Sequence, residues 1–239
     1  MTGTAPQDRL HDTVLLDVDG TLVDSTYHHA IAWHRAFRSY GIELPMWRVH
    51  RAIGMGGDRL VGTLGGDAVE DRLGDQLRQA WQCEYDQLRD EVEPLPGAYD
   101  LVRLLKDRGF LVALGSSGKP DHTAQAVELV GVRRLVDAVT TSEDAQTSKP
   151  APDILQVALD RAGGTSAIVI GDSTYDVTSA ARMGAPCVAI RTGGFGVDEL
   201  ERTGAVLVTD GLRDLCDADW EALARATPPE HARTEPPPP

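Results

Sequence analysis

The stretch "TVLLDVDGTLVDS", residues 13–25, decides the fold of this chain. Its first four residues are a short apolar run, typical of a strand buried on both faces of a parallel sheet. Asp17 and Asp19 follow, separated only by Val18, and Gly20 begins a turn. Two carboxylates this close repel each other unless a cation lies among them. The stretch therefore predicts a buried sheet and a site at the end of its first strand.

Five further apolar runs follow along the chain, at residues 110–115, 137–140, 167–170, 187–190 and 206–208. Helical patterns lie between most of them. In residues 97–109, for example, Leu101, Val102 and Leu105 share one helix face, and Gly109 suits a helix end. Strands that alternate with helices predict a parallel sheet with right-handed crossovers. We therefore expect an α/β fold with a doubly wound, Rossmann-like parallel-sheet core.

The segment after the first strand breaks this alternation. Residues 26–93 show no convincing strand pattern and read as helices over 26–41, 46–64 and 67–91. We expect an inserted α-helical cap at residues 25–93, on a core made of residues 1–24 and 94–226. The proline-rich residues 227–239 have little to bury, so we expect a disordered tail there.

The composition limits the partners and the location. A formal net charge of −14 argues against a non-specific nucleic-acid surface or an anionic-membrane surface. No apolar stretch approaches the length of a membrane span, and residues 1–12 have no apolar signal region. Cys83, Cys187 and Cys216 lie far apart without metal-ligand spacing, as reduced thiols do. We expect a cytoplasmic protein with no nucleic-acid or membrane partner, whose oligomeric state the sequence does not indicate.

The unusual polar residues all follow predicted strands. They are Asp17, Asp19, Ser116, Ser117, Lys149, Asp172 and Asp176. Ligands of open parallel sheets bind at the carboxyl ends of the strands. Each of these residues alone is common in proteins, but their joint placement at one sheet edge indicates a site.

This set of side chains suits phosphate chemistry with Mg²⁺. Carboxylate oxygens are the ligands that Mg²⁺ prefers. An EF-hand calcium loop is excluded because Thr21 and Leu22 stand where Asp or Asn and Gly are needed. Ser116, nearby backbone N–H groups and Lys149 can hold phosphate oxygens. One carboxylate can attack phosphorus, and a second can protonate the leaving alcohol and later take a proton from water.

With these motifs the chain resembles the haloacid dehalogenase-like hydrolases over about residues 12–210. "DVDGTLVDS" (17–25), "LGSS" (114–117), "SKPAPD" (148–153) and "GDSTYDV" (171–177) are similar to the four motifs of that superfamily. The resemblance implies that Asp17 is the nucleophile and Asp19 the acid/base, and that phosphate is bound by Ser116, Ser117, Gly20 and Lys149. It also implies Mg²⁺ held by Asp17, the Asp19 backbone carbonyl and Asp172, with Asp176 as an acid just outside these ligands.

The cap segment resembles the small helical cap of the phosphoglycolate phosphatase and β-phosphoglucomutase branch. Dehalogenases lack the second aspartate, so Asp19 argues against that activity. Phosphonoacetaldehyde hydrolases need a cap lysine, and the lysines of this chain are Lys106, Lys119 and Lys149, all outside the cap. His29 with Trp33 resembles a pair in the sugar phosphomutases, but the arginine and lysine that those enzymes place later in the cap have no clear match.

We therefore expect an Mg²⁺-dependent phosphatase that hydrolyses a small phosphorylated metabolite through an aspartyl-phosphate. A sugar phosphomutase and a non-catalytic binding protein are the alternatives, and phosphoglycolate, a sugar phosphate and a nucleotide monophosphate all remain open as substrates. His29 and Arg59 are candidate substrate contacts in the cap. Trp33 and Phe37, four residues apart on one helix, are predicted to belong to the cap core.

Overall fold

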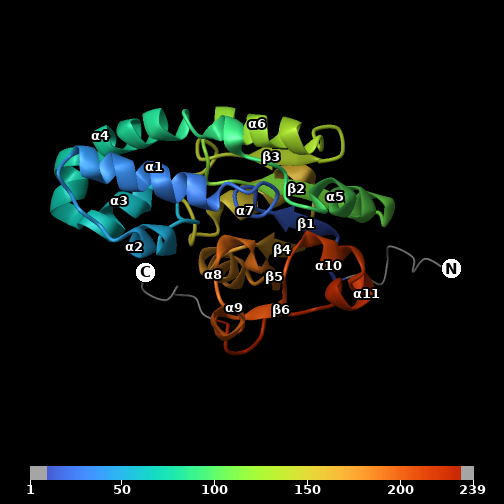
Figure 1. Cartoon of the computed structure of the whole chain (residues 1–239). Coiled ribbons are helices and arrows are strands. Elements are labelled where there is room, and N and C mark those ends of the chain that lie inside the picture. Colours follow the sequence, from blue (N-terminus) through green and yellow to red (C-terminus); the bar gives the residue numbers. More distant parts are fainter. Residues whose placement is uncertain (1–9, 233–239) are drawn as a thin grey trace.

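The computed structural model describes residues 10–232 and contains one central sheet (Figure 1). Its six parallel strands lie in the order β3-β2-β1-β4-β5-β6. They are β1 (Thr13–Leu16), β2 (Leu111–Gly115), β3 (Ala138–Thr140), β4 (Ala167–Gly171), β5 (Cys187–Ile190) and β6 (Ala205–Thr209). Every predicted strand is present, and the predicted α/β doubly wound fold is confirmed.

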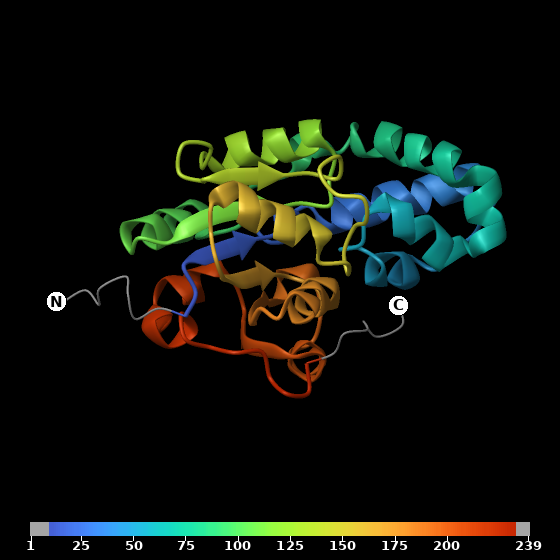
Figure 2. The same ribbon diagram turned by 180° about the vertical axis from the view of Figure 1, so that it is seen from behind.

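Helices cover both faces of the sheet. One face packs against α5 (Ala98–Asp107), α6 (Pro120–Val130), α10 (Leu212–Cys216) and α11 (Trp220–Leu223). The other packs against α7 (Asp153–Ala162), α8 (Thr174–Met183) and α9 (Val197–Thr203), and α7 and α8 lie in front of the sheet in Figure 2. Strand β1 serves both layers, because Val14 and Leu16 enter the first core cluster and Leu15 the second. Apolar residues on both faces explain the unbroken apolar run in the sequence.

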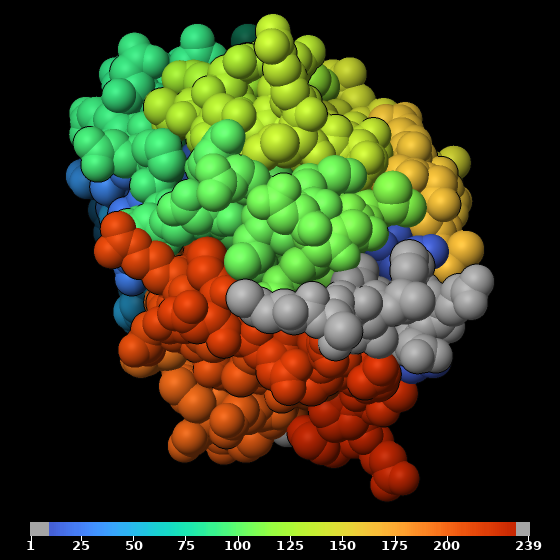
Figure 3. Space-filling model, turned by 90° about the vertical axis from the view of Figure 1, so that its right-hand side faces the viewer, coloured from blue at the N-terminus to red at the C-terminus, as the bar shows by residue number. Residues whose placement is uncertain are grey.

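The end of the molecule away from the cap is closed by contacts between distant segments. Figure 3 looks onto this end, where the residues of α5 in green lie against the C-terminal helices in red. Trp220 of α11 is buried there, and its ring meets Phe110 edge-on at 5.9 Å between centroids. The contacts at this end are apolar packing contacts, whereas the predicted site residues lie at the opposite edge of the sheet.

The segment between β1 and α5 is helical, as predicted. It contains α1 (Thr26–Ser39), α2 (Met46–Arg51), α3 (Gly57–Gly65), α4 (Asp67–Tyr85) and the short 3₁₀ helix η2 (Arg89–Glu91). Helices α1 to α4 share a core cluster of their own, in which Trp33 and Phe37 are buried, so the prediction for these two residues is confirmed. Figure 1 shows α1 to α4 grouped at one end of the sheet, where they overhang the strand ends.

No helix within residues 10–232 is long and apolar enough to cross a bilayer.

The C-terminal end of the described chain contacts the core. Residues 227–232 contain no helix or strand, yet His231 Nε2 donates to the carbonyl oxygen of Glu201 at 3.1 Å, and Ala232 lies against Gly204. This part of the predicted disordered tail therefore contacts α9, and residues 233–239 lie outside the described residues.

Candidate active site

Three buried carboxylates lie together at the carboxyl ends of β1 and β4. Asp17 follows β1, and its backbone N–H donates to the carbonyl of Ile170 in β4 at 2.9 Å, which holds the two strand ends level. Asp172 follows β4, and Asp176 lies in the first turn of α8. Carboxylate oxygens of Asp17, Asp172 and Asp176 all lie within 4.8 Å of one another. The structure thus brings together three of the predicted site residues.

Lys149 is the cation of this cluster. Its ammonium is buried and forms ion pairs with Asp17 and with Asp176, the latter at 2.8 Å. Asp176 is fixed further by Ser173, whose backbone N–H and hydroxyl donate to its other oxygen at 3.1 and 2.6 Å. The Lys149 ammonium therefore lies between the carboxylates of Asp17 and Asp176. Lys149 itself belongs to the loop that follows β3.

The charge balance of the cluster leaves room for a second cation. Burial raises the pKa of Asp17 to about 7, because the attraction of Lys149 is outweighed by desolvation and by repulsion from Asp176 and Asp19. Burial, and then the charges of Asp176 and Asp17, also raise the pKa of Asp172 well above its usual range. One ammonium does not balance three carboxylates, and their oxygen atoms are the donor set that Mg²⁺ prefers. The residues present therefore fit a divalent cation.

Two glycines let the backbone approach Asp172 closely. Gly20 has a positive φ of 76°, and a Cβ there would overlap the Asp172 carboxylate. A Cβ on Gly193 would overlap the same group from the other side. Asp172 is also hydrogen-bonded by the hydroxyl of Thr21 at 3.1 Å. Gly20, predicted to contact phosphate, thus lies directly against a candidate metal ligand.

Asp19 faces a different environment from the three clustered carboxylates. Its Oδ1 accepts hydrogen bonds from the Ser25 hydroxyl at 2.7 Å and from His29 Nε2 at 3.0 Å. Burial alone would raise the pKa of Asp19, but the attraction and hydrogen bond of His29 and the hydrogen bond of Ser25 hold it at about 2. The His29 ring is itself fixed by stacking on Tyr85, with ring centroids 4.1 Å apart and planes 6° from parallel. His29 thus contacts Asp19 from the cap side.

The loop after β2 brings two serines and a glycine to the same edge. The hydroxyl oxygen of Ser116 accepts from the Gly118 N–H at 2.9 Å and from the Thr123 hydroxyl at 3.1 Å. A Cβ on Gly118 would lie 3.1 Å from an oxygen of Asp19, so this loop closely borders Asp19. The hydroxyl of Ser117 is buried and has no hydrogen-bond partner within residues 10–232. Ser117, one of the residues predicted to hold phosphate, also lines the same cavity as Asp17 and Asp19.

Two adjoining cavities lie between the cap and the core. The smaller, of about 60 Å³, is lined by Asp17, Asp19, His29 and Trp33 among others. The larger, of about 240 Å³, is lined by residues from α4, the loop after β2 and the loop after β3. Arg59 lines neither cavity and is exposed on α3, whereas Arg78 of α4 lines the larger one. The substrate contact proposed for Arg59 has no support from this placement.

Sequence reasoning missed the aromatic wall that α4 contributes. Trp81 and Tyr85 stack on each other and on His29, and Trp81 also stacks on Trp33 at 5.2 Å between centroids. Their spacing of four residues placed Trp81 and Tyr85 on one face of the predicted helix. That spacing is the signal available in the sequence, but it does not reveal that this face turns toward the strand ends.

The cap is in contact with the core around the site. His50 Nε2 donates to the carbonyl of Gly193 at 2.8 Å, and the Tyr175 hydroxyl donates to the carbonyl of Arg51 at 2.8 Å. On another side the Gly56 N–H donates to the hydroxyl of Ser148, next to Lys149, at 3.1 Å. These contacts join the helical segment to the core beside Asp172 and beside Lys149.

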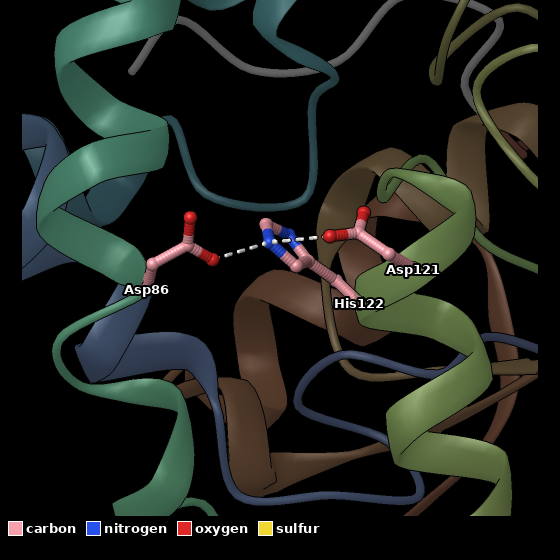
Figure 4. Close-up of side chains that lie close together, drawn as sticks. All are labelled: Asp86, Asp121 and His122. Atoms are coloured by element: carbon pink, nitrogen blue, oxygen red, sulfur yellow. Dashed lines mark hydrogen bonds and ion pairs between the residues drawn. The ribbon is translucent and has the colours of Figure 1, made fainter.

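A second group of possible ligands lies where α4 meets α6. Figure 4 shows Asp86 and Asp121 on either side of His122, whose Nε2 lies 3.1 and 3.7 Å from their oxygens. Arg89 also pairs with both carboxylates, at 3.4 and 3.7 Å. Nδ1 of His122 is buried without a partner in the described chain, whereas a metal-bound histidine normally donates its second N–H. This group therefore fits an ionic contact between cap and core better than a metal site.

Comparison with known proteins identifies the family of this chain. A family model described as haloacid dehalogenase-like hydrolase matches residues 14–190, which include all the strand-end carboxylates above. The chain belongs to the haloacid dehalogenase-like hydrolases. It is accordingly a hydrolytic enzyme, and the resemblance given by its motifs is confirmed.

Three proteins illustrate what this haloacid dehalogenase-like hydrolase is similar to. Phosphoglycolate phosphatase 1 of Pseudomonas aeruginosa is 28% identical over 215 residues, covering 87% of this chain and 79% of that protein. Validoxylamine A 7'-phosphate phosphatase of Streptomyces hygroscopicus subsp. limoneus is 25% identical over 225 residues, covering 88% and 97%. The crystal structure of a hydrolase from Pseudomonas syringae has a TM-score of 0.81 at 31% identity, covering 86% of this chain and 96% of that one.

Proposed function

We propose that this hydrolase is an Mg²⁺-dependent phosphatase that cleaves a small phosphomonoester through an aspartyl-phosphate on Asp17. The observation that carries the proposal is the cluster of Asp17, Asp172 and Asp176 around Lys149, with Asp19 and His29 beside it. Relatives named as phosphatases of phosphoglycolate and of validoxylamine A 7'-phosphate support small phosphorylated molecules as the substrate class.

Asp17 is the proposed nucleophile. A carboxylate oxygen attacks phosphorus, the ester oxygen leaves, and water later releases phosphate from the aspartyl group. Lys149, held by Asp17 and Asp176, offsets the negative charge that an approaching phosphate brings. The hydroxyls of Ser116 and Ser117, with backbone N–H groups of the same loop, are the proposed donors to the phosphate oxygens.

Asp19 is the proposed acid and base. In the substrate-free state its low pKa makes it an anion held by His29 and Ser25. A bound phosphate adds negative charge nearby and raises the proton affinity of Asp19, which allows it to carry a proton to the leaving oxygen. Once the alcohol has left, Asp19 takes a proton from the attacking water. His29 then acts by orienting Asp19 rather than by touching the phosphate.

Mg²⁺ would be held by Asp17, the backbone carbonyl of Asp19 and Asp172, with Asp176 beside them. When bound, it supplies positive charge that lowers the repulsion between the carboxylate nucleophile and the phosphate. The carboxylate oxygens of Asp17, Asp172 and Asp176, which all lie within 4.8 Å of one another, are the observation on this chain that favours such an ion.

Sugar phosphomutase activity is not favoured. A mutase must hold a second phosphate in its cap, and the cap contains no lysine. Its Arg78 is already paired with Glu70 and Asp75, at 2.8 and 2.9 Å.

The division into a core of residues 1–24 and 94–226 and a cap of residues 25–93 remains part of the proposal. So does a cytoplasmic location, with which the free Cys83, Cys187 and Cys216 agree.

A direct test measures hydrolysis of 4-nitrophenyl phosphate by the whole chain, with Mg²⁺ and with excess chelator. We expect turnover with Mg²⁺ and none with chelator, restored when Mg²⁺ is added back. Rapid quenching should trap phosphate on the protein, and peptide mapping should locate it on Asp17. No hydrolysis of any phosphomonoester would overturn the proposal in favour of a binding protein. Full activity in chelator would show that the phosphatase does not depend on Mg²⁺.

A further inference from the structure

The larger cavity adjoins the small cavity above Asp17 and Asp19. The two share Gly57, Trp81 and Ser117 as walls, and the larger one extends from there toward the loop after β3. Its volume of about 240 Å³ is just below the roughly 300–1,000 Å³ of pockets that hold drug-sized ligands. A two-carbon acid would leave most of this space unfilled, so the cavity suits a leaving group nearer the size of a sugar ring.

Two hydrogen-bond donors in the walls that the cavities share have no partner in the described part of the chain. Trp81 is only 8% exposed, and its indole Nε1 has no hydrogen-bond partner within residues 10–232. The same holds for the buried hydroxyl of Ser117. A buried donor without an acceptor is costly and calls for a ligand or water that supplies one. Both residues line both cavities, so these donors belong to the part of the wall that the two cavities share.

The charges around the larger cavity are balanced. Arg78 is neutralised by Glu70 and Asp75. Lys119 hydrogen-bonds the neutral side chain of Gln82, and Asp58 supplies one carboxylate that accepts from the Ser148 N–H at 3.2 Å. One positive and one negative side chain do not select an anion. Asp58 can accept a hydrogen bond from a ligand hydroxyl, which an ionised carboxylate does not provide.

The other polar walls of the cavity are hydroxyl and amide groups. Ser142, Gln146 and Thr147 line it from the loop after β3, and Trp81 lines it from the cap. Hydroxyls and amides both donate and accept, which matches ligand hydroxyls that do the same. An aromatic ring beside them offers a face for the C–H side of a polyol.

We propose that this cavity binds the leaving group of the substrate, and that this leaving group is an uncharged polyhydroxylated molecule of about the size of a sugar or cyclitol ring. Trp81 donates to one of its oxygens, and Gln146, from the loop after β3, is a specificity-determining residue of the same cavity. This inference rests on the proposed phosphatase function, and it assigns the loop after β3 a part in substrate choice.

The first test compares four substrates of the whole chain in Mg²⁺: a hexose 6-phosphate, phosphoglycolate, pyrophosphate and 4-nitrophenyl phosphate. We expect kcat/KM for the hexose phosphate to exceed that for phosphoglycolate and for pyrophosphate by tenfold or more. Hydrolysis of phosphoglycolate or pyrophosphate as fast as the sugar phosphate would overturn the inference while leaving the phosphatase intact. Failure to hydrolyse even 4-nitrophenyl phosphate would overturn both.

The second test uses Gln146→Ala and Trp81→Phe, with Trp47→Phe as a matched control because Trp47 is 62% exposed and lines neither cavity. For the hexose phosphate we expect each cavity variant to lower kcat/KM roughly three- to tenfold, mainly through KM, because one hydrogen bond to the leaving group is lost. The loss should be clearly smaller for 4-nitrophenyl phosphate, and Trp47→Phe should match wild type on both. An equal loss on both substrates, or none on the sugar phosphate, would contradict the assignment.

Discussion

Asp12 and Asp17 stand at the two ends of the same strand, β1, and their surroundings are opposite in kind. Asp12 accepts hydrogen bonds from the backbone N–H and the hydroxyl of Thr165, at 3.0 and 2.7 Å, and from the hydroxyl of Thr13 at 2.7 Å. Among the described residues the Asp17 carboxylate has one partner, Lys149, which it shares with Asp176, and two carboxylates lie beside it. The Asp12 carboxylate is surrounded by hydrogen-bond donors, whereas the Asp17 carboxylate lies beside two other carboxylates and shares its single cation with one of them.

The pKa shifts of the two groups reflect this difference. Some burial works to raise the pKa of Asp12, but hydrogen bonds from Thr165, Thr13 and Ser166 outweigh it, so the pKa is lowered. At Asp17, burial and the neighbouring carboxylates raise the pKa to about 7. The charged form of Asp12 therefore stabilises the fold, whereas the charged form of Asp17 costs stability until a cation or substrate arrives. We infer that one end of β1 serves folding and the other serves chemistry.

Asp17→Asn tests this contrast with the largest expected effect. The amide has the same shape but cannot attack phosphorus, so kcat should fall by about 10⁴-fold or more. At pH 8 without Mg²⁺ the Tm should be at or above that of wild type, because a buried charge with a raised pKa has been removed. Thermal unfolding and 4-nitrophenyl phosphate hydrolysis measure the two effects. A large drop in Tm would mean that Asp17 is a structural residue like Asp12.

Asp172→Asn sharpens the comparison at the proposed metal site. A ligand that binds only the folded protein raises its stability by about 2.7 kcal/mol at a hundred times its Kd. Mg²⁺ should therefore raise the Tm of the wild type by roughly 5–10 °C at such a concentration. The variant should need far more Mg²⁺ for the same rise, while Asp198→Asn, an exposed carboxylate on α9, should behave as wild type. If the Tm of all three proteins rose equally with Mg²⁺ concentration, Asp172 would not be a ligand of the ion.

Asp19→Asn separates the acid/base from the nucleophile. Loss of leaving-group protonation should lower kcat by about 10²–10⁴-fold for alkyl phosphates. The loss should be smaller for 4-nitrophenyl phosphate, whose leaving group needs less help from a proton. His29→Ala should reproduce this substrate dependence in weaker form, on the order of tenfold or less, if it orients Asp19. An identical loss on alkyl and aryl esters would contradict the role of Asp19.

The sequence predicted the core of this fold because two signals agreed there. Unbroken apolar runs marked strands such as β1 and β4, and polar residues directly after them marked the active edge, since parallel strands end on one side. Asp17 lies beside both Lys149 and Asp172, although each of these is more than a hundred residues from it in the sequence. Local spacing was sufficient here because the topology of a parallel sheet brings the strand ends together.

The cap was less predictable because its helices follow no such rule. Helix patterns located α1 and α4, yet nothing in them tells at what angle a helix crosses the strand ends. Arg59 therefore looked like a substrate contact but is exposed, while Trp81 and Arg78 line the cavity. Asp12 also escaped notice, because its role depends on Thr165, whose loop lies next to it only in the folded sheet.

Asp12→Ala is the change with the smallest effect on catalysis, and it completes the comparison. Thr165 and Ser166 lose their acceptor at the end of the sheet opposite the site, and because Thr165 is exposed to water the cost is about 0.5–1.5 kcal/mol. For a chain of this size that lowers the Tm by roughly 1–6 °C, while kcat/KM should stay within twofold of wild type. The pH dependence has a definite sign. Since the folded pKa of Asp12 is below its ordinary value, the contribution is present above that ordinary pKa of 3.8 and is lost as the pH falls below it. Melting curves from pH 3 to pH 7 should therefore show the difference between wild type and variant shrinking at the acid end. A variant that keeps its Tm but loses activity would reverse the roles assigned to the two ends of β1.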